Sequence, residues 1–207
     1  MSVQESVSID PSRAVLIIQD MQNDVMMDGG AWADSGAPQH AKEQNVVENV
    51  RNLAEACRRA GIPVIHVWYI VEAGAPGLKL NAPLFQGVKD TNGLVRGSWG
   101  AAPAEGLEAQ DGDLVVEKMR MNAFHGTRLD TLLRGLGVET LIITGAWTNM
   151  SIEHTARHAA DAGYRAVVAS DGTSTVDDEW QNVALNYAMQ NVAAVGTCAE
   201  IASAFGG

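Results

Sequence analysis

The stretch Ala14-Val-Leu-Ile-Ile18, followed at once by Gln19 and Asp20, decides the fold of this chain. An uninterrupted aliphatic run of this length is typical of a strand that is buried on both faces, as in parallel sheets covered by helices. Further short apolar runs along the chain predict five more strands, at residues 64–69, 113–117, 140–144, 165–169 and 192–195.

Longer amphipathic stretches separate these runs. Residues 41–60 carry apolar side chains at three- and four-residue spacing, which predicts a helix that ends at Gly61. Similar patterns predict helices at 127–135, 149–163, 177–191 and 199–205. The alternation of strands and helices predicts one α/β domain over residues 1–207, with a doubly wound, six-stranded, mostly parallel sheet and helices on both faces.

Residues 70–110 are rich in glycine and show no regular period. A stretch of this length without periodicity exceeds an ordinary loop, so we expect either a lid over a site or a subunit contact.

The composition excludes several classes of function. The chain has 14 Lys and Arg against 25 Asp and Glu, a net charge of −11, which argues against nucleic-acid and anionic-membrane partners. No apolar run approaches the roughly 20 residues that cross a bilayer, and no secretory signal is visible, so we expect a cytoplasmic protein. Cys57 and Cys198 are too few for a disulfide scaffold or a zinc cluster.

Polar side chains follow three of the predicted strands. Asp20 follows the first, Lys118 the third, and Ser151 begins the helix after the fourth. Taken singly, each has an ordinary interpretation: a turn carboxylate, a solvated lysine and a helix-capping serine. Because open parallel sheets bind ligands beyond the carboxyl ends of their strands, the joint placement favours a site. Gln19 and Asp24 are expected to orient Asp20 and the following loop rather than to react.

Four motifs carry a resemblance to a known family. They are AVLIIQDMQND at 14–24, GSWG at 97–100, VEKMRMNAFHGT at 116–127 and TGAWTNMSIEHTAR at 144–157. In these motifs the chain resembles the isochorismatase-like cysteine hydrolase superfamily over essentially its whole length. The resemblance implies a catalytic triad of Asp20, Lys118 and residue 151, which is cysteine in that family and Ser151 here. It also implies an oxyanion hole formed by the N–H groups of Trp147 and Ser151, with a cis peptide between Ala146 and Trp147.

Four accounts of Ser151 stay open. It is an engineered replacement of cysteine, which would nearly stop turnover because a hydroxyl ionises far less readily than a thiol. It is a natural nucleophile, with Asp20 as base and Lys118 as electrostatic partner. Alternatively no covalent step occurs and Asp20 protonates a vinyl ether, as in true isochorismatases. The last account is a non-catalytic binding module. The segment Trp147-Thr-Asn-Met resembles the amide-hydrolase branch, so hydrolysis of an amide or ureido C–N bond ranks first.

The remaining predicted site residues are mostly aromatic. Trp99, Asn122, Phe124 and Trp147 are expected to bind a small-molecule substrate, and Trp32 is weighed evenly between substrate contact and packing.

We expect no metal and no cofactor. The Asp-x-His motif of nicotinamidases is missing after the second predicted strand, His66 is expected in the core, and His154 and His158 are expected on an exposed helix face. The resemblance further implies a homo-oligomer, a dimer or tetramer.

Overall fold

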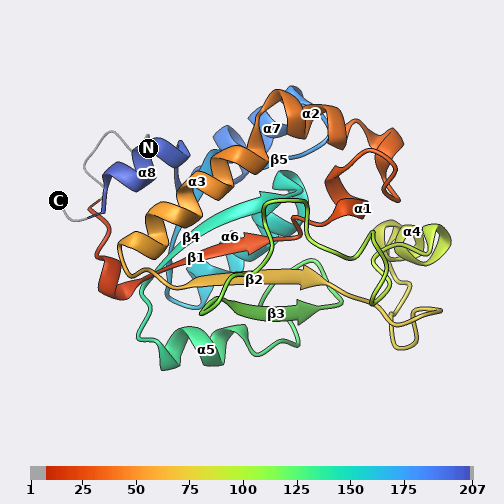
Figure 1. The fold of residues 1–207 in the computed structure, drawn as a ribbon, viewed down its shortest axis with the longest axis horizontal. Helices are drawn as coiled ribbons and strands as arrows, with labels where there is room; N and C mark the ends of the chain where they lie inside the picture. The colour runs from red at the N-terminus through yellow and green to blue at the C-terminus, as the bar shows by residue number, and fades with distance from the viewer. Residues whose placement is uncertain (1–7, 206–207) are drawn as a thin grey trace.

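The computed structural model describes residues 8–205, in which six strands form one sheet in the order β3-β2-β1-β4-β5-β6 (Figure 1). The strands are β1 (Ala14–Gln19), β2 (Val64–Tyr69), β3 (Leu114–Lys118), β4 (Thr140–Ala146), β5 (Arg165–Ser174) and β6 (Ala193–Gly196). Every neighbouring pair is parallel, so the predicted doubly wound sheet is confirmed and is parallel throughout. The strand order reverses between β1 and β4, which places the switch point there.

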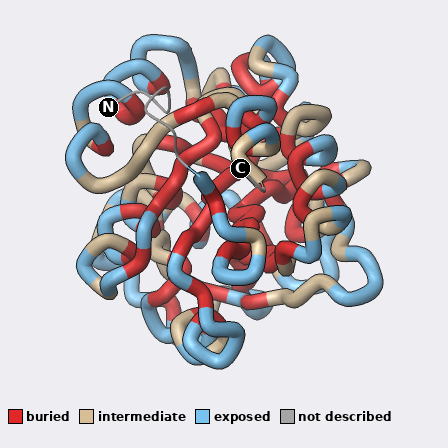
Figure 2. The backbone as a smooth tube through the Cα atoms, turned by 90° about the vertical axis from the view of Figure 1, so that its left-hand side faces the viewer, coloured by how far each residue is buried: buried red, intermediate tan, exposed pale blue. Residues whose placement is uncertain are grey.

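Helices cover both faces of the sheet. Because successive side chains of a strand point to opposite faces, an all-aliphatic strand presents apolar surface on both, and each face must be covered. The helices are α1 (Asn23–Met26), α2 (Ala37–Glu43), α3 (Val46–Arg59), α4 (Pro83–Thr91), α5 (Leu129–Gly135), α6 (Glu153–Asp161), α7 (Asp178–Val183) and α8 (Cys198–Ser203). Leu16 and Ile18 pack in one core cluster with α3 and α8, whereas Val15 and Ile17 pack in the other with α5 and α6. All six residues of β1 are buried, as the aliphatic run predicts. Figure 2 shows that the buried residues lie mostly in the interior and the exposed ones mostly in the outer turns.

Three helix predictions differ from the structure. The helix expected at 41–60 is two helices, α2 and α3, because Asn45 adopts a left-handed conformation with φ of 53°. Asparagine tolerates that conformation better than most residues do. The helix expected at 149–163 begins as a π-helical turn, Thr148–Ile152, and that expected at 177–191 ends in another, Ala184–Ala188.

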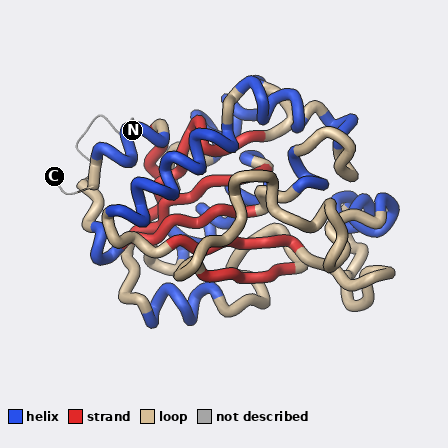
Figure 3. Tube along the Cα trace, viewed as in Figure 1, coloured by secondary structure: helices blue, strands red, loops and turns tan. Residues whose placement is uncertain are grey.

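The stretch 70–110 is not wholly irregular, since it contains α4 (Figure 3). Together with α1, α4 lies beyond the arrowheads of β1 and β2, at the edge of the sheet where the carboxyl ends of the strands meet. The expected lid position is therefore occupied by a short amphipathic helix and its flanking turns.

Candidate active site

The three predicted catalytic residues lie together at the carboxyl ends of the strands. Asp20 follows β1, Lys118 ends β3, and Ser151 lies in the π-helical turn after β4. The close approach of β4 to β1 requires Gly145, because a Cβ atom there would lie 1.9 Å from the carbonyl oxygen of Gln19. Single π-helical turns of this kind are frequent at functional sites.

Asp20 and Lys118 form a buried ion pair. Lys118 Nζ donates to Asp20 Oδ2 at 2.8 Å, with 0% and 5% of the two side chains exposed. The same ammonium donates to the carbonyl oxygens of Arg120 and Met121, each at 2.9 Å, and lies 5.0 Å from the centre of the Tyr69 ring. All three N–H groups of the ammonium are therefore engaged.

Burial shapes the acidity of both members of the pair. It raises the pKa of Asp20, while Lys118, the Ser151 hydroxyl and Gln19 act in the opposite direction. Burial also lowers the pKa of Lys118, and Asp20 opposes that shift. Ser151 and Asp20 line the same pocket, and Asp20 Oδ1 has no hydrogen-bond partner among residues 8–205. This oxygen is free to exchange a proton with a neighbouring group, the role of a general base or acid.

Gln19 connects the segments that carry the three residues. Its buried amide nitrogen donates to the carbonyl oxygens of Ser151 at 3.1 Å and Met121 at 3.2 Å. Its amide oxygen accepts from Thr155 Oγ1 at 2.9 Å. These contacts link Gln19 to the turns that follow β3 and β4 and to α6. The expected role of Gln19 in orienting Asp20 stays a prediction.

A pocket opens over Asp20 and Ser151. It measures about 440 Å³, including space open to solvent. Its other walls come from three parts of the chain: Val25 and Trp32 after β1; Tyr69, Leu84, Val88 and Leu94 from the end of β2 and the α4 region; and Ala146, Trp147 and Met150 after β4. The site is therefore an apolar chamber with its polar groups gathered at one end.

Trp147 occupies the position that the resemblance implies. The Ala146–Trp147 peptide is cis, as expected, and the indole N–H of Trp147 donates to the carbonyl oxygen of Val25 at 3.2 Å. Trp32, which the sequence left between two roles, also lines the pocket.

The other predicted substrate-binding residues lie outside the pocket lining. Trp99 is 58% exposed, and its carbonyl oxygen accepts from Asn23 Nδ2 at 2.8 Å. Phe124 is buried in the core, where its ring stacks on His158 with centres 4.6 Å apart. Asn122 Oδ1 accepts from the backbone N–H of Phe124 at 2.7 Å, which stabilises the turn after β3.

Sequence reasoning missed the apolar walls contributed by Leu84, Val88 and Leu94. The local signal for these walls was the spacing of apolar residues in the segment that forms α4. The glycines around that segment interrupt the pattern, so no helix was predicted there.

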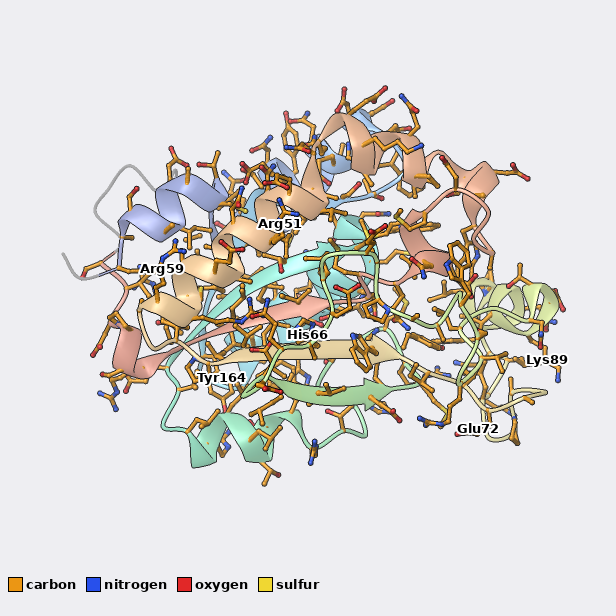
Figure 4. All side chains as sticks on the ribbon, in the orientation of Figure 1. Arg51, Arg59, His66, Glu72, Lys89 and Tyr164 are labelled. Carbon is orange, nitrogen blue, oxygen red and sulfur yellow. The ribbon has the colours of Figure 1, made fainter. Side chains whose placement is uncertain are left out.

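The remaining candidate metal ligands and thiols lie outside the pocket lining. Within residues 8–205 no group of three or more His, Cys, Asp and Glu side chains is placed to hold a metal ion. His66 lies within β2 (Figure 4), where its Nε2 is 3.1 Å from Asp113 Oδ2. Cys57 and Cys198 are both buried outside the lining of this pocket. Burial raises the pKa of the Cys57 thiol to about 12 and also raises that of Cys198.

No helix in the described part of the chain is both long and apolar enough to cross a membrane. The homo-oligomer implied by the resemblance stays a prediction.

Comparison with known proteins identifies relatives over most of the chain. Residues 14–200 match the family model of the isochorismatase domain. The ureidoacrylate amidohydrolase RutB of Methylobacterium radiotolerans is 32% identical over 189 residues, which cover 84% of this chain and 72% of that protein.

Solved structures agree with this match. A cysteine hydrolase from Pseudomonas syringae pv. phaseolicola superposes with a TM-score of 0.84 at 27% identity, over 95% of this chain and 94% of that one. N-carbamoylsarcosine amidase from Thermoplasma acidophilum superposes with a TM-score of 0.70 at 25% identity, over 90% and 96% respectively.

Proposed function

The chain belongs to the isochorismatase family of hydrolases, and on that basis we propose that it hydrolyses the C–N bond of a small amide or ureido compound through Asp20, Lys118 and Ser151. The observation that carries this proposal is that Asp20, which forms a buried ion pair with Lys118, lines one pocket with Ser151. The relatives named for ureidoacrylate and N-carbamoylsarcosine support a C–N bond as the target.

The first half of the reaction forms an acyl-enzyme. Ser151 Oγ attacks the substrate carbonyl carbon while its proton passes to Asp20 Oδ1, the oxygen without a partner. The N–H groups of Trp147 and Ser151 stabilise the oxyanion. The C–N bond then breaks, Asp20 returns the proton to the leaving nitrogen, and the amine or ammonia departs.

The second half regenerates the enzyme. Asp20 removes a proton from water, which attacks the acyl ester, and the acid product leaves as Ser151 regains its proton. Lys118 stabilises ionised Asp20 and holds it in place through the 2.8 Å contact. Serine performs these steps more slowly than cysteine, because its hydroxyl is much harder to ionise than a thiol.

The test is turnover of primary amides, ureido compounds and isochorismate by the parent protein, Ser151→Cys and Ser151→Ala. Ser203→Cys, an exposed serine on α8, is the matched control for introducing a thiol. We expect Ser151→Cys to raise amide hydrolysis by at least tenfold and Ser151→Ala to abolish it, with Ser203→Cys unchanged.

Two results would contradict the proposal. Turnover of isochorismate alone, insensitive to Ser151→Ala but lost in Asp20→Ala, would assign acid-catalysed vinyl-ether hydrolysis. Binding without turnover, even by Ser151→Cys, would assign a non-catalytic binding module.

A further inference from the structure

Away from Asp20 and Ser151, the lining side chains that carry a polar atom are those of Tyr69, Trp147 and Trp32. The Tyr69 hydroxyl donates to the carbonyl oxygen of Met119 at 2.8 Å, and the Trp147 indole N–H is bound to Val25. All remaining lining side chains except that of Trp32 are purely hydrocarbon or thioether. A substrate therefore meets Asp20 and Ser151 in this pocket and otherwise a wall that is mostly apolar.

No cationic side chain is among the described residues that line this pocket. Lys118 lies behind Asp20 with its three N–H groups engaged. Arg120 is held outside the lining, with its guanidinium 3.5 Å from the centre of the Phe85 ring and bonded to the carbonyl oxygen of Lys79 and to Asn81 Oδ1.

Binding a negatively charged substrate group in this pocket would cost free energy. The group would give up its water without gaining a cationic partner, and it would share the pocket with the Asp20 carboxylate. The net charge of the chain, −11, adds no long-range attraction for an anion.

We propose that the part of the substrate away from the scissile C–N bond is neutral and apolar, so that this chain acts on compact neutral amides or monosubstituted ureas. The inference rests on the proposed function and specifies its substrate class. It separates this chain from its relative named for ureidoacrylate, a carboxylate, because the observed walls offer a carboxylate no cation.

Matched substrate pairs test the inference, since a carboxylate and an isopropyl group have nearly the same shape. One pair is 4-methylpentanamide and succinamate, and the other is 3-methylbutylurea and N-carbamoyl-β-alanine. We expect the neutral member to be preferred at least about 100-fold in kcat/KM, by the parent protein and by Ser151→Cys, because an unpaired charge costs more than the one methylene that already discriminates 10- to 200-fold.

A cation placed in the wall should reverse the preference. Leu84 is a partly buried lining residue on α4, so Leu84→Arg brings a guanidinium to the pocket. Leu80→Arg, at a position 41% exposed and outside the lining, adds the same charge as the control. We expect at least a tenfold shift toward the anionic member in Leu84→Arg and none in Leu80→Arg.

The outcomes separate this inference from the proposed function. Turnover of the pairs with equal or better use of the anions would overturn the inference and leave the function standing. If no pair is turned over, the proposed function fails, and calorimetric binding of the same compounds to Ser151→Ala decides the inference. Tighter binding of the neutral members would support it, whereas tighter binding of the anions, equal binding or no binding of the neutral members would overturn it.

Discussion

Replacing Lys118 by methionine tests the buried ion pair, because it removes the ammonium and keeps most of the volume of the side chain. Asp20 would then lie in the same buried place without its cation. A carboxyl group in that position escapes the cost of a buried charge by binding a proton. The cost of protonation therefore sets an upper limit on the loss of stability.

That limit depends on pH. Relative to an ordinary aspartate pKa of 3.8, protonating Asp20 costs about 4 kcal/mol at pH 7 and about 2 kcal/mol at pH 5. The carbonyl oxygens of Arg120 and Met121 also lose a donor, which costs about 1 kcal/mol each at any pH. Because the folded pKa of Asp20 in Lys118→Met lies above its unfolded value, the variant loses stability as the pH rises.

Urea denaturation followed by tryptophan fluorescence at pH 5, 6 and 7 measures this effect. We expect Lys118→Met to be destabilised by up to about 6 kcal/mol at pH 7 and by less at pH 5. The difference between the two pH values is smaller than the limit, because the pKa of Asp20 is already raised in the parent protein. The double variant Asp20→Asn/Lys118→Met removes both charges and should abolish the added pH dependence. A loss below about 1 kcal/mol that is equal at pH 5 and pH 7 would refute the buried pair.

Two buried polar side chains, Gln19 beside the site and His66 within β2, give two further predictions. Gln19→Leu removes the contacts to Ser151 and Met121, so kcat should fall by about 10- to 100-fold with little change in KM. Steady-state kinetics measures both constants. A change confined to KM would exclude an orienting role for Gln19. Burial lowers the pKa of His66 below its ordinary value of 6.5, although Asp113 opposes the shift. The folded protein therefore favours the neutral imidazole, and it loses stability as the pH falls below 6.5, where the unfolded chain binds the proton. His66→Gln should flatten the melting temperature between pH 7 and pH 5, and an unchanged pH profile would contradict this assignment.

The position of the site follows from signals that are local in sequence. The run ending at Ile18 is buried on both faces because it consists only of aliphatic side chains, and a parallel sheet is the structure that accommodates such strands. Once the strands are parallel, all of their carboxyl ends meet at one edge of the sheet. That Asp20 lies against Lys118 and shares a pocket with Ser151 was therefore predictable, although the three residues are far apart along the chain.

The direction of side chains in the connecting segments was not predictable in this way. Phe124 and Trp147 both follow a strand and both are aromatic, yet Phe124 packs in the core against His158 and Trp147 lines the pocket. Which way each ring points depends on the path of its turn, and that path is set by partners from distant parts of the chain, such as Val25 for Trp147.

The sequence by itself thus determined the six strands and their parallel sheet, because apolar runs and their alternation with helices depend on neighbouring residues. It also placed Asp20, Lys118 and Ser151 after strands, at the edge where the candidate site lies. Only the tertiary structure decided which residues form the walls. Leu84 and Leu94 reach the site because the segment around α4 folds back over the carboxyl ends of the strands, and no local pattern encodes that contact. The absence of a cation from these walls, and with it the proposed neutral substrate, is a property of the folded chain alone.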